Sequence, residues 1–433
     1  MTKKRIAIIG GGISGLTAAR YLHKDFDIEL YESNDYIGGH THTHDVVIDG
    51  KTFPVNTGFI VYNDWVYHNF NKLIEPLNLK RIPTEMSFSV TDEQTGLEYN
   101  GHNLDTLFAQ RSNLLSPRFY GMIRDILKFN KQSLEDLEQG KLDDSLTLRD
   151  YFKQLNMGSM FINKYIVPMG AAIWSSGEAD MLDFPALFFV RFFKNHGLLS
   201  VKDRPQWYVL DQGSRAYVDP LIAPFRDRVH TNTRISSVVR NPEHVIVQFE
   251  DKPEETFDEV IFACHSDQAL ALLDSPTEDE HAILGALPYS KNEVVLHTDE
   301  RLLPKRRKAW AAWNYHLSDD KNAPASLTYN MNILQRFDDA PVTFCVTLNR
   351  TEKIDKDKII ARFNYGHPIF SQGSVAAQQQ YHRIGNKNRT HFCGAYWFNG
   401  FHEDGVNSAL RVVDDVQKTA SVKPLKESES AHA

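Results

Sequence analysis

The sequence predicts an α/β fold (α+β overall), in which a Rossmann-like dinucleotide-binding domain is joined to a second domain of mixed sheet and helices. Residues 4–9 form an apolar, strand-like run that leads into a glycine-rich turn at residues 10–15, and a helix-like run follows over residues 16–22. Residues 67–205 carry apolar residues at helical spacing, whereas strand-like alternation dominates residues 294–348. These patterns of apolar residues predict the two domains.

The first element is a dinucleotide fingerprint with both ends present. Gly10 permits a tight turn, Gly12 lets backbone amides approach a pyrophosphate, and Gly15 lets helix and strand pack closely. Glu32 ends the next apolar stretch, about 20 residues later, at the distance expected for a carboxylate that binds a ribose 2′-OH. The pattern favours nucleotide binding over a simple glycine-rich turn.

A second glycine pair follows this carboxylate and precedes His40 and Thr41. The segment resembles the FAD-binding segment of the flavin-containing amine oxidase superfamily, which includes phytoene desaturase-like and protoporphyrinogen oxidase-like enzymes. In that superfamily an arginine follows the pair; here His40 replaces it, and a neutral imidazole can donate one hydrogen bond. The resemblance implies an FAD-binding domain of the glutathione-reductase/amine-oxidase type.

The end of the chain supplies a matching segment. Residues 390–397 predict a short buried strand ending in a glycine, and residues 400–409 open a helix that reaches about Val416. By the resemblance, residues 404–406 lie against the isoalloxazine, where free amides and the helix dipole stabilise negative charge on the reduced flavin. Cys393 lies inside the predicted strand, so we expect noncovalent FAD.

The middle of the chain adds a third segment. Residues 229–239, 245–249 and 257–263 predict successive strands. In the superfamily such a unit contributes an adenine contact, which we assign to Ile235. Together the segments predict FAD contacts at Gly10, Gly12, Ile13, Ser14, Gly15, Glu32, Ser33, Gly39, His40, Thr41, Gly58, Phe59, Ile60, Ile235, Gly394, Asp404, Gly405 and Val406.

A narrower resemblance covers about residues 3–418. The strings at residues 39–41, 56–63, 195–199 and 401–405 resemble a bacterial family of predicted amine-oxidase-like FAD/NAD-binding flavoproteins. Its members often accompany cyclopropane-fatty-acid-synthase-like methyltransferases, which implies action on fatty-acyl chains and a partner lipid methyltransferase.

These resemblances predict an FAD-dependent oxidoreductase that transfers hydride between an apolar fatty-acyl lipid and flavin N5, for example in acyl-chain desaturation. Three alternatives stay open: an amine oxidase that uses dioxygen, a flavin-dependent fatty-acid double-bond isomerase, and a flavin-binding scaffold that is inert alone. The substrate, the electron acceptor, the catalytic residues and the oligomeric state do not follow from the sequence.

The composition of the chain limits the kinds of partner and the cellular location that we expect. The 433-residue chain has a net charge of −8, which argues against nucleic acid as its main partner. Its three cysteines are far apart and predict reduced thiols. No apolar run approaches the ~20 residues of a membrane span and no signal peptide precedes the first strand, so we expect a cytoplasmic protein, with peripheral contact at the inner face of the membrane as an open alternative.

The predicted domains are discontinuous. Residues 1–66, 206–268 and 386–420 form the FAD-binding domain, and residues 67–205 and 269–385 the substrate-binding domain. We expect residues 421–433, a polar tail, to be disordered.

Several residues are candidates for substrate contact, for a position near the flavin or for metal binding. Phe184 to Phe193 contain five phenylalanines, which predict a buried helix, a lining for a long apolar substrate or a membrane-touching patch. Lys291 is the nearest candidate for a lysine near flavin N5. His40, His42 and His44 could share one face of a strand, but packing is favoured over a metal site. The predicted substrate contacts are Phe188, Phe192, Tyr396 and Trp397.

Overall fold

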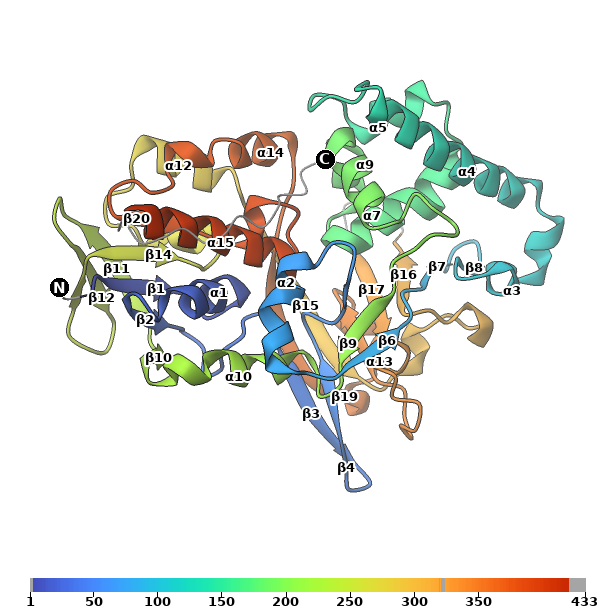
Figure 1. Cartoon of the computed structure of the whole chain (residues 1–433). Helices are drawn as coiled ribbons and strands as arrows, with labels where there is room; N and C mark the ends of the chain where they lie inside the picture. The colour runs from blue at the N-terminus through green and yellow to red at the C-terminus, as the bar shows by residue number, and fades with distance from the viewer. Residues whose placement is uncertain (1–2, 319, 321–323, 420–433) are drawn as a thin grey trace.

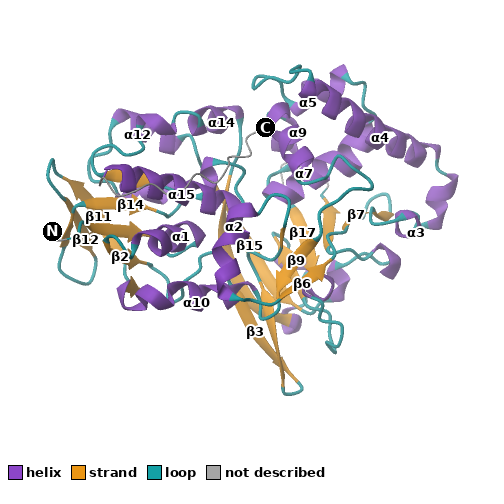
Figure 2. Cartoon of the chain, in the orientation of Figure 1, coloured by secondary structure: helices purple, strands orange, loops and turns teal. Residues whose placement is uncertain are grey.

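The computed structural model describes residues 3–318, 320 and 324–419, and its elements form two lobes (Figure 1). One lobe contains the N-terminal strand and the C-terminal helix, although they lie at opposite ends of the chain. The other lobe combines a large sheet with a helical layer, as Figure 2 shows. The predicted polar tail lies outside the described residues.

The first lobe is built on a five-stranded parallel sheet. Its order is β10 (Val229–His230), β2 (Asp27–Tyr31), β1 (Arg5–Ile9), β14 (Glu259–Phe262) and β20 (Thr390–Phe392). The strands β1 and β14 are mostly apolar and buried on both faces, as parallel strands covered by helices require. The sequence-distant segments predicted for this fold therefore meet in one sheet.

Two helices pack together beside this sheet. They are α1 (Ile13–Leu22), which starts at the glycine-rich turn, and α15 (His402–Thr419), which runs slightly past its predicted end. A three-stranded antiparallel sheet lies alongside, formed by β11 (Ile235–Arg240), β12 (Val245–Phe249) and β13 (Glu255–Phe257).

Two strand predictions are wrong in their extent. The strand expected over residues 229–239 is divided between two sheets, because Asn232 adopts a left-handed conformation (φ 50°) and its N–H donates to the Asn34 carbonyl. The strand expected over residues 390–397 stops at Phe392, and residues Ala395–Trp397 form a 3₁₀ turn after Gly394.

The second lobe is built on a seven-stranded mixed sheet. Its order is β19 (Ile359–Pro368), β15 (Tyr289–His297), β18 (Cys345–Leu348), β17 (Ser326–Asn330), β16 (Trp313–Leu317), β7 (Phe88–Asp92) and β8 (Leu97–Asn100). Its strands β15, β16, β17 and β18 account for the strand-like alternation predicted over residues 294–348. β7 and β8 come from the region predicted to be helical, so that prediction was incomplete.

Residues 67–205, where helical spacing of apolar residues was predicted, contain the α-helices α2 to α9. They are α2 (His68–Ile74), α3 (Leu104–Leu107), α4 (Pro117–Glu138) and α5 (Leu148–Gln154), followed by α6 (Ser159–Phe161), α7 (Val167–Trp174), α8 (Glu178–Leu182) and α9 (Ala186–Asn195). Three of the predicted helices have side-chain N-caps, at Asn103, Ser116 and Thr147, which satisfy free backbone N–H groups.

Smaller elements complete the two lobes. They are the hairpin β3 (Thr43–Ile48) and β4 (Lys51–Asn56), the small sheet of β5 (Tyr62–Asn63), β9 (Trp207–Leu210) and β6 (Arg81–Thr84), and the helices α10 (Val218–Ile222), α11 (Ser266–Leu272), α12 (Glu278–Gly285), α13 (Met331–Gln335) and α14 (Gln372–Gln378).

The phenylalanine cluster belongs to the core of the second lobe. Phe184, Phe189, Phe192 and Phe193 are each at most 4% exposed and pack around Trp174 and one another. The prediction of a buried helix is confirmed, and these four rings form no membrane-touching patch. No helix within the described ranges is both long and apolar enough to cross a bilayer.

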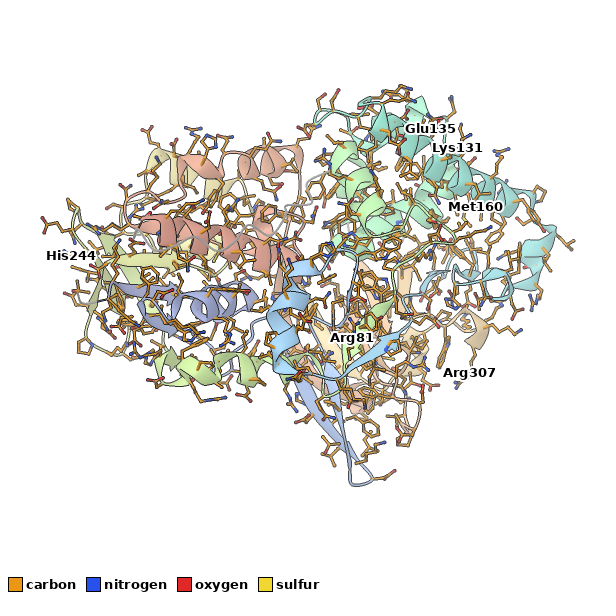
Figure 3. The ribbon with its side chains drawn as sticks, viewed as in Figure 1. Arg81, Lys131, Glu135, Met160, His244 and Arg307 are labelled. Atoms are coloured by element: carbon orange, nitrogen blue, oxygen red, sulfur yellow. The ribbon has the colours of Figure 1, made fainter. Side chains whose placement is uncertain are left out.

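A basic run at residues 305–308 is neutralised locally. Arg306 pairs with Glu98 at 2.8 Å, Arg307 with Glu300 at 3.0 Å, and Lys308 with Asp105 at 2.9 Å. Arg307 lies at the periphery of the second lobe (Figure 3). The run is therefore a surface network of ion pairs.

Candidate functional site

One cavity of about 2000 Å³ extends from the glycine-rich turn in the first lobe to the sheet and helices of the second lobe. Pockets for a single small ligand usually enclose about 300–1,000 Å³. The cavity therefore has room for a large cofactor together with a substrate.

The turn between β1 and α1 is shaped for close approach. Gly10 has φ 111°, which favours glycine, and a Cβ on Gly15 would lie 1.9 Å from the Gly10 carbonyl oxygen. Gly12 is different: it has ordinary extended geometry (φ −76°, ψ −177°), and a Cβ there would meet no protein atom within 4 Å. The protein leaves open space at Gly12, beside the N-terminus of α1, where an anion is favoured.

Glu32 organises this turn from the next strand. Its buried carboxylate accepts hydrogen bonds from the Gly11 N–H at 2.8 Å, the Asn34 N–H at 2.9 Å and the Asn34 side-chain amide at 2.7 Å. The same carboxylate lines the cavity. It therefore occupies the place that the fingerprint predicts for the ribose-binding group.

The cavity continues along the antiparallel sheet of this lobe, beside β11 and β12. Thr233, Arg234, Ile235 and Glu250 line the cavity there. The backbone connects this end to the turn, since the Thr233 N–H donates to the Glu32 carbonyl at 2.9 Å. Ile235 thus lies where the sequence predicts an adenine contact.

Most of the predicted cofactor contacts converge on the cavity. Those that line it are Gly10, Gly12, Ile13, Ser14, Glu32, Ser33, Gly39, His40, Gly58, Phe59, Ile60, Ile235 and Gly394. The open cradle at Gly12, the carboxylate at the ribose position and the size of the cavity fit an FAD molecule.

Five predicted contacts lie behind the cavity wall. Gly15 packs against Gly10, and Thr41 bonds to Tyr217 at 2.5 Å and to His402 at 3.2 Å. Asp404, Gly405 and Val406 do not line the cavity. A Cβ at Gly405 would lie 2.7 Å from the Ile13 side chain, so this glycine lets α15 approach α1. Residues 399–402, just before it, line the cavity in their place.

The first turn of α15 holds two buried carboxyl groups. Glu403 accepts from the Asn69 and Phe70 N–H groups, both at 2.8 Å, and Asp404 accepts from the Phe401 N–H at 2.9 Å. Burial raises the pKa of Glu403 to about 7 and that of Asp404 to about 7. When these carboxyls are protonated, they leave the positive end of the helix dipole uncompensated beside the cavity.

Three histidines form a wall of the cavity between the two lobes. The His40 ring lies 6.1 Å from His265 and 5.5 Å from His367. Burial lowers the pKa of His265 to about 3 and of His367 to about 3, and it also lowers that of His40. The Nε2 of His40 is buried and has no hydrogen-bond partner among the described residues.

The alternating histidines do not converge. His42 bonds to the Tyr365 hydroxyl at 2.8 Å and stacks on Tyr36, whereas His44 contacts Phe363. Within the part of the chain that the structure describes, no three His, Cys, Asp or Glu side chains are placed to hold a metal ion.

The second lobe gives the cavity a long apolar wall. Its lining includes Met86, Phe88, Tyr99, Leu107, Tyr165, Met169, Ile173, Trp174, Phe192, Leu198, Trp313, Tyr329 and Phe370. Phe192 is a predicted substrate contact. Lys291 also lines the cavity, on β15 opposite Gly366.

Three other predicted substrate contacts lie elsewhere. Phe188 stacks on Phe370 outside the cavity lining, with a ring distance of 5.3 Å. Tyr396 and Trp397 are buried in the core of the first lobe, where Trp397 packs against Tyr381. They do not form an aromatic cage at the cavity.

Sequence reasoning missed several lining residues. His265, Gly366 and His367 follow or end strands whose edges the sequence did not locate, and Arg204 lies in a loop without a motif. Phe401 and His402 were inside a recognised string, so their position could have been found.

Comparisons with known proteins agree with this geometry. The sequence pattern of the family described as flavin containing amine oxidoreductase matches residues 13–417. A 4,4'-diaponeurosporene oxygenase of Staphylococcus aureus (strain bovine RF122 / ET3-1) is 23% identical over 262 residues, which are 56% of this chain and 52% of the relative. A carotenoid phi-ring synthase of Chlorobaculum tepidum is 22% identical over 339 residues, 73% of this chain and 44% of the relative. The chain thus spans about half the length of these curated relatives.

Solved structures share the fold over nearly the whole chain. Cyclohexylamine oxidase from Brevibacterium oxydans IH-35A aligns with a TM-score of 0.70 at 14% identity, covering 97% of this chain and 100% of the other. A fatty acid isomerase from P. acnes aligns with a TM-score of 0.69 at 16% identity, covering 96% and 98%. These likenesses confirm a Rossmann-like domain combined with a substrate domain.

Proposed function

The chain belongs to the family of flavin-containing amine oxidoreductases, and from this premise we propose that it binds FAD noncovalently and oxidises or reduces a long apolar acyl chain. The observation that supports the proposal is the continuous cavity, which joins the glycine-rich turn and Glu32 to an apolar wall. When bound, the flavin supplies hydride transfer.

The residues of the first lobe would hold the cofactor. Gly12 and the N-terminus of α1 would face the pyrophosphate, Glu32 the ribose, and Ile235 the adenine. The His40 ring, which lines the cavity, would lie beside the cofactor, in the place where the superfamily has an arginine. The dipole of α15 would stabilise negative charge near its N-terminus.

Noncovalent binding is supported by the cysteines. Cys393 is fully buried outside the cavity lining, and burial raises the pKa of the lining Cys264 thiol to about 12, so it stays protonated and unreactive. Acid precipitation of the purified yellow protein should release all flavin into the supernatant as FAD. Flavin retained in the protein pellet would contradict this part of the proposal.

The apolar wall would align the substrate and exclude water, because its side chains are aromatic or aliphatic over most of their surface. Two of the relatives are named for carotenoid chemistry, and carotenoids are long apolar molecules. This supports an apolar chain over a small amine as the substrate.

The test is anaerobic mixing of the purified holoprotein with an acyl phospholipid and, separately, with a panel of amines. We expect the oxidised flavin absorbance to bleach with the lipid, and a new double bond to be found in the product. Met169→Glu, which places a charge on the cavity wall, should abolish bleaching, whereas Leu127→Glu on the exposed face of α4 should not. Bleaching by an amine alone would make the protein an amine oxidase; an isomerised lipid without bleaching would make it an isomerase.

We further propose that the protein works in the cytoplasm at the inner face of the membrane, with a lipid methyltransferase as its partner. The support is the resemblance of its motif strings to flavoproteins that accompany such enzymes. Sedimentation with phospholipid vesicles and co-purification with the methyltransferase test the two parts separately.

A further inference from the structure

We propose that Arg204, at the rim of the cavity, binds the anionic headgroup of a long-chain amphiphile, either a carboxylate or a phosphate. The proposal deepens the proposed function, on which it rests, by naming the polar end of the substrate. The same side chain would set how far the acyl chain reaches into the cavity.

The loop that carries Arg204 holds its guanidinium in place. The Arg204 Nε–H donates to the Ser200 carbonyl at 2.9 Å, and the Ser200 hydroxyl accepts from the backbone N–H groups of residues 202 and 203. Gly197 (φ 67°) brings the start of the loop back onto Pro205. With Nε occupied, the two Nη groups donate no hydrogen bond to the described residues and can bind two oxygens of one anion.

The charge of this guanidinium is uncompensated by its surroundings. Within residues 3–318, 320 and 324–419, no carboxylate lies within 4.0 Å of it, whereas two other arginines that line the cavity, Arg234 and Arg336, each pair with an acidic side chain. A cation that lines a cavity without a partner is well placed to bind an anion from solution.

Apolar side chains share the cavity lining with Arg204. Leu104 and Val201 line the cavity yet are 76% and 60% exposed, which places them at its opening. Leu198 and Leu107 are further apolar residues of the same lining. Tyr165 lies close enough to feel the guanidinium: burial raises the pKa of its hydroxyl, and the Arg204 charge opposes that rise.

This arrangement matches an amphiphile with one charged end. The apolar wall would hold the chain, and the rim cation would hold the head at the surface, where it keeps part of its hydration. A small amine would find no matching charge at Arg204. Glu85, the acidic residue between β6 and β7 that lines the same cavity, is already bonded to Ser87 and lies 3.8 Å from His102.

The experiment measures ligand affinity without turnover. Trp174, Trp207 and Trp313 line the cavity, so their fluorescence should report binding in the FAD-loaded protein. The probes are oleate, oleoyl phosphate, oleyl alcohol, oleylamine and inorganic phosphate. We expect the two anionic lipids to bind about ten-fold more tightly than the alcohol, since a charge-assisted hydrogen bond is worth about that much.

Variants assign the preference to one side chain. Arg204→Gln should lose the preference for the anionic lipids and keep the affinity for the alcohol, and Arg204→Lys should restore part of it. The matched control is Lys202→Gln, an exposed cation two residues away that does not line the cavity. This control should behave as the wild type.

The outcomes separate the two levels of the proposal. Binding of neither lipid nor alcohol would overturn the acyl-chain function itself, as would tightest binding of oleylamine. Equal binding of oleate and oleyl alcohol, or an anion preference that survives Arg204→Gln, would overturn the role of Arg204 alone. Inorganic phosphate that binds as tightly as oleoyl phosphate would show a site for the free anion and overturn headgroup recognition.

Discussion

Gly12→Val tests the cofactor cradle, because it separates the needs of the fold from the needs of the ligand. The structure shows no protein atom within 4 Å of a Cβ at this position, and the backbone there is in a region open to any residue. The variant should therefore fold. The added side chain would fill the space that the pyrophosphate needs, so it should not bind FAD.

The two effects differ greatly in size. For folding, the change replaces a favourable N-cap residue by a poor one, which costs about 1 kcal/mol or less. For binding, displacing the pyrophosphate would remove one or two charge-assisted hydrogen bonds worth about 1.5–3 kcal/mol each. That loss weakens the FAD affinity by about ten-fold or more for one bond and by about 100-fold or more for two.

The assay has two parts. Circular dichroism of the apoprotein follows thermal unfolding, and the midpoint of Gly12→Val should lie within a few degrees of the wild type. Titration of FAD, followed by its fluorescence, then gives the dissociation constant. The matched variant is Gly15→Val, where the Cβ would lie 1.9 Å from the Gly10 carbonyl oxygen, and this protein should not fold. Wild-type FAD affinity in Gly12→Val would refute the placement of the pyrophosphate.

Three further predictions follow from the same contacts. Glu32→Gln removes the charge that accepts from the Gly11 N–H, and titration should show FAD affinity reduced about 10- to 100-fold; an unchanged dissociation constant would exclude this carboxylate from the site. Gly121→Ala on α4, where a Cβ would meet no atom within 4 Å, should stabilise the apoprotein by about 0.5–1 kcal/mol. Gly405→Ala should instead lower the thermal unfolding midpoint, because its Cβ would lie 2.7 Å from the Ile13 side chain. Equal shifts of the thermal midpoint in the two variants would contradict the close packing of α1 and α15. Burial lowers the pKa of five histidines to about 3 or 4, namely His196, His265, His297, His316 and His367, so between pH 6.5 and 4 the unfolded chain binds more protons than the folded chain. The urea midpoint of unfolding should therefore be lower at pH 5 than at pH 7, although Glu403 and Asp404, whose pKa values are raised to about 7, have the opposite effect and are fewer. A urea midpoint that rises on acidification would contradict this assignment.

The parallel sheet and its cofactor end were predictable because their signals are local. A strand, a glycine-rich turn and a helix follow one another within residues 5–22, and the carboxylate of Glu32 ends the next strand. The turn itself depends on residues close in sequence, since Gly15 packs against the Gly10 carbonyl. β14 pairs with β1, and its run Val260–Phe262 is apolar and buried, as a central parallel strand requires.

The substrate side was harder to predict, because its geometry depends on long-range packing. Tyr396 and Trp397 stand next to a cofactor motif in sequence, yet the turn after Gly394 directs both rings into the core beside Tyr381. Phe188 and Phe192 lie one helical turn apart on α9, but only Phe192 lines the cavity. Helical periodicity identifies a buried face without saying which part of that face meets a cavity.

Gly12 and Gly15 show the same limit within a single motif. Both belong to the fingerprint, and the sequence assigns them different roles from a pattern alone. The structure gives each role a physical cause: at Gly15 the nearby Gly10 carbonyl leaves no room for a Cβ, so the fold itself requires glycine. At Gly12 no protein atom makes that demand, so only a molecule outside the chain can. A glycine with open space around it indicates ligand binding more strongly than a tightly packed glycine does, because packing alone does not account for it.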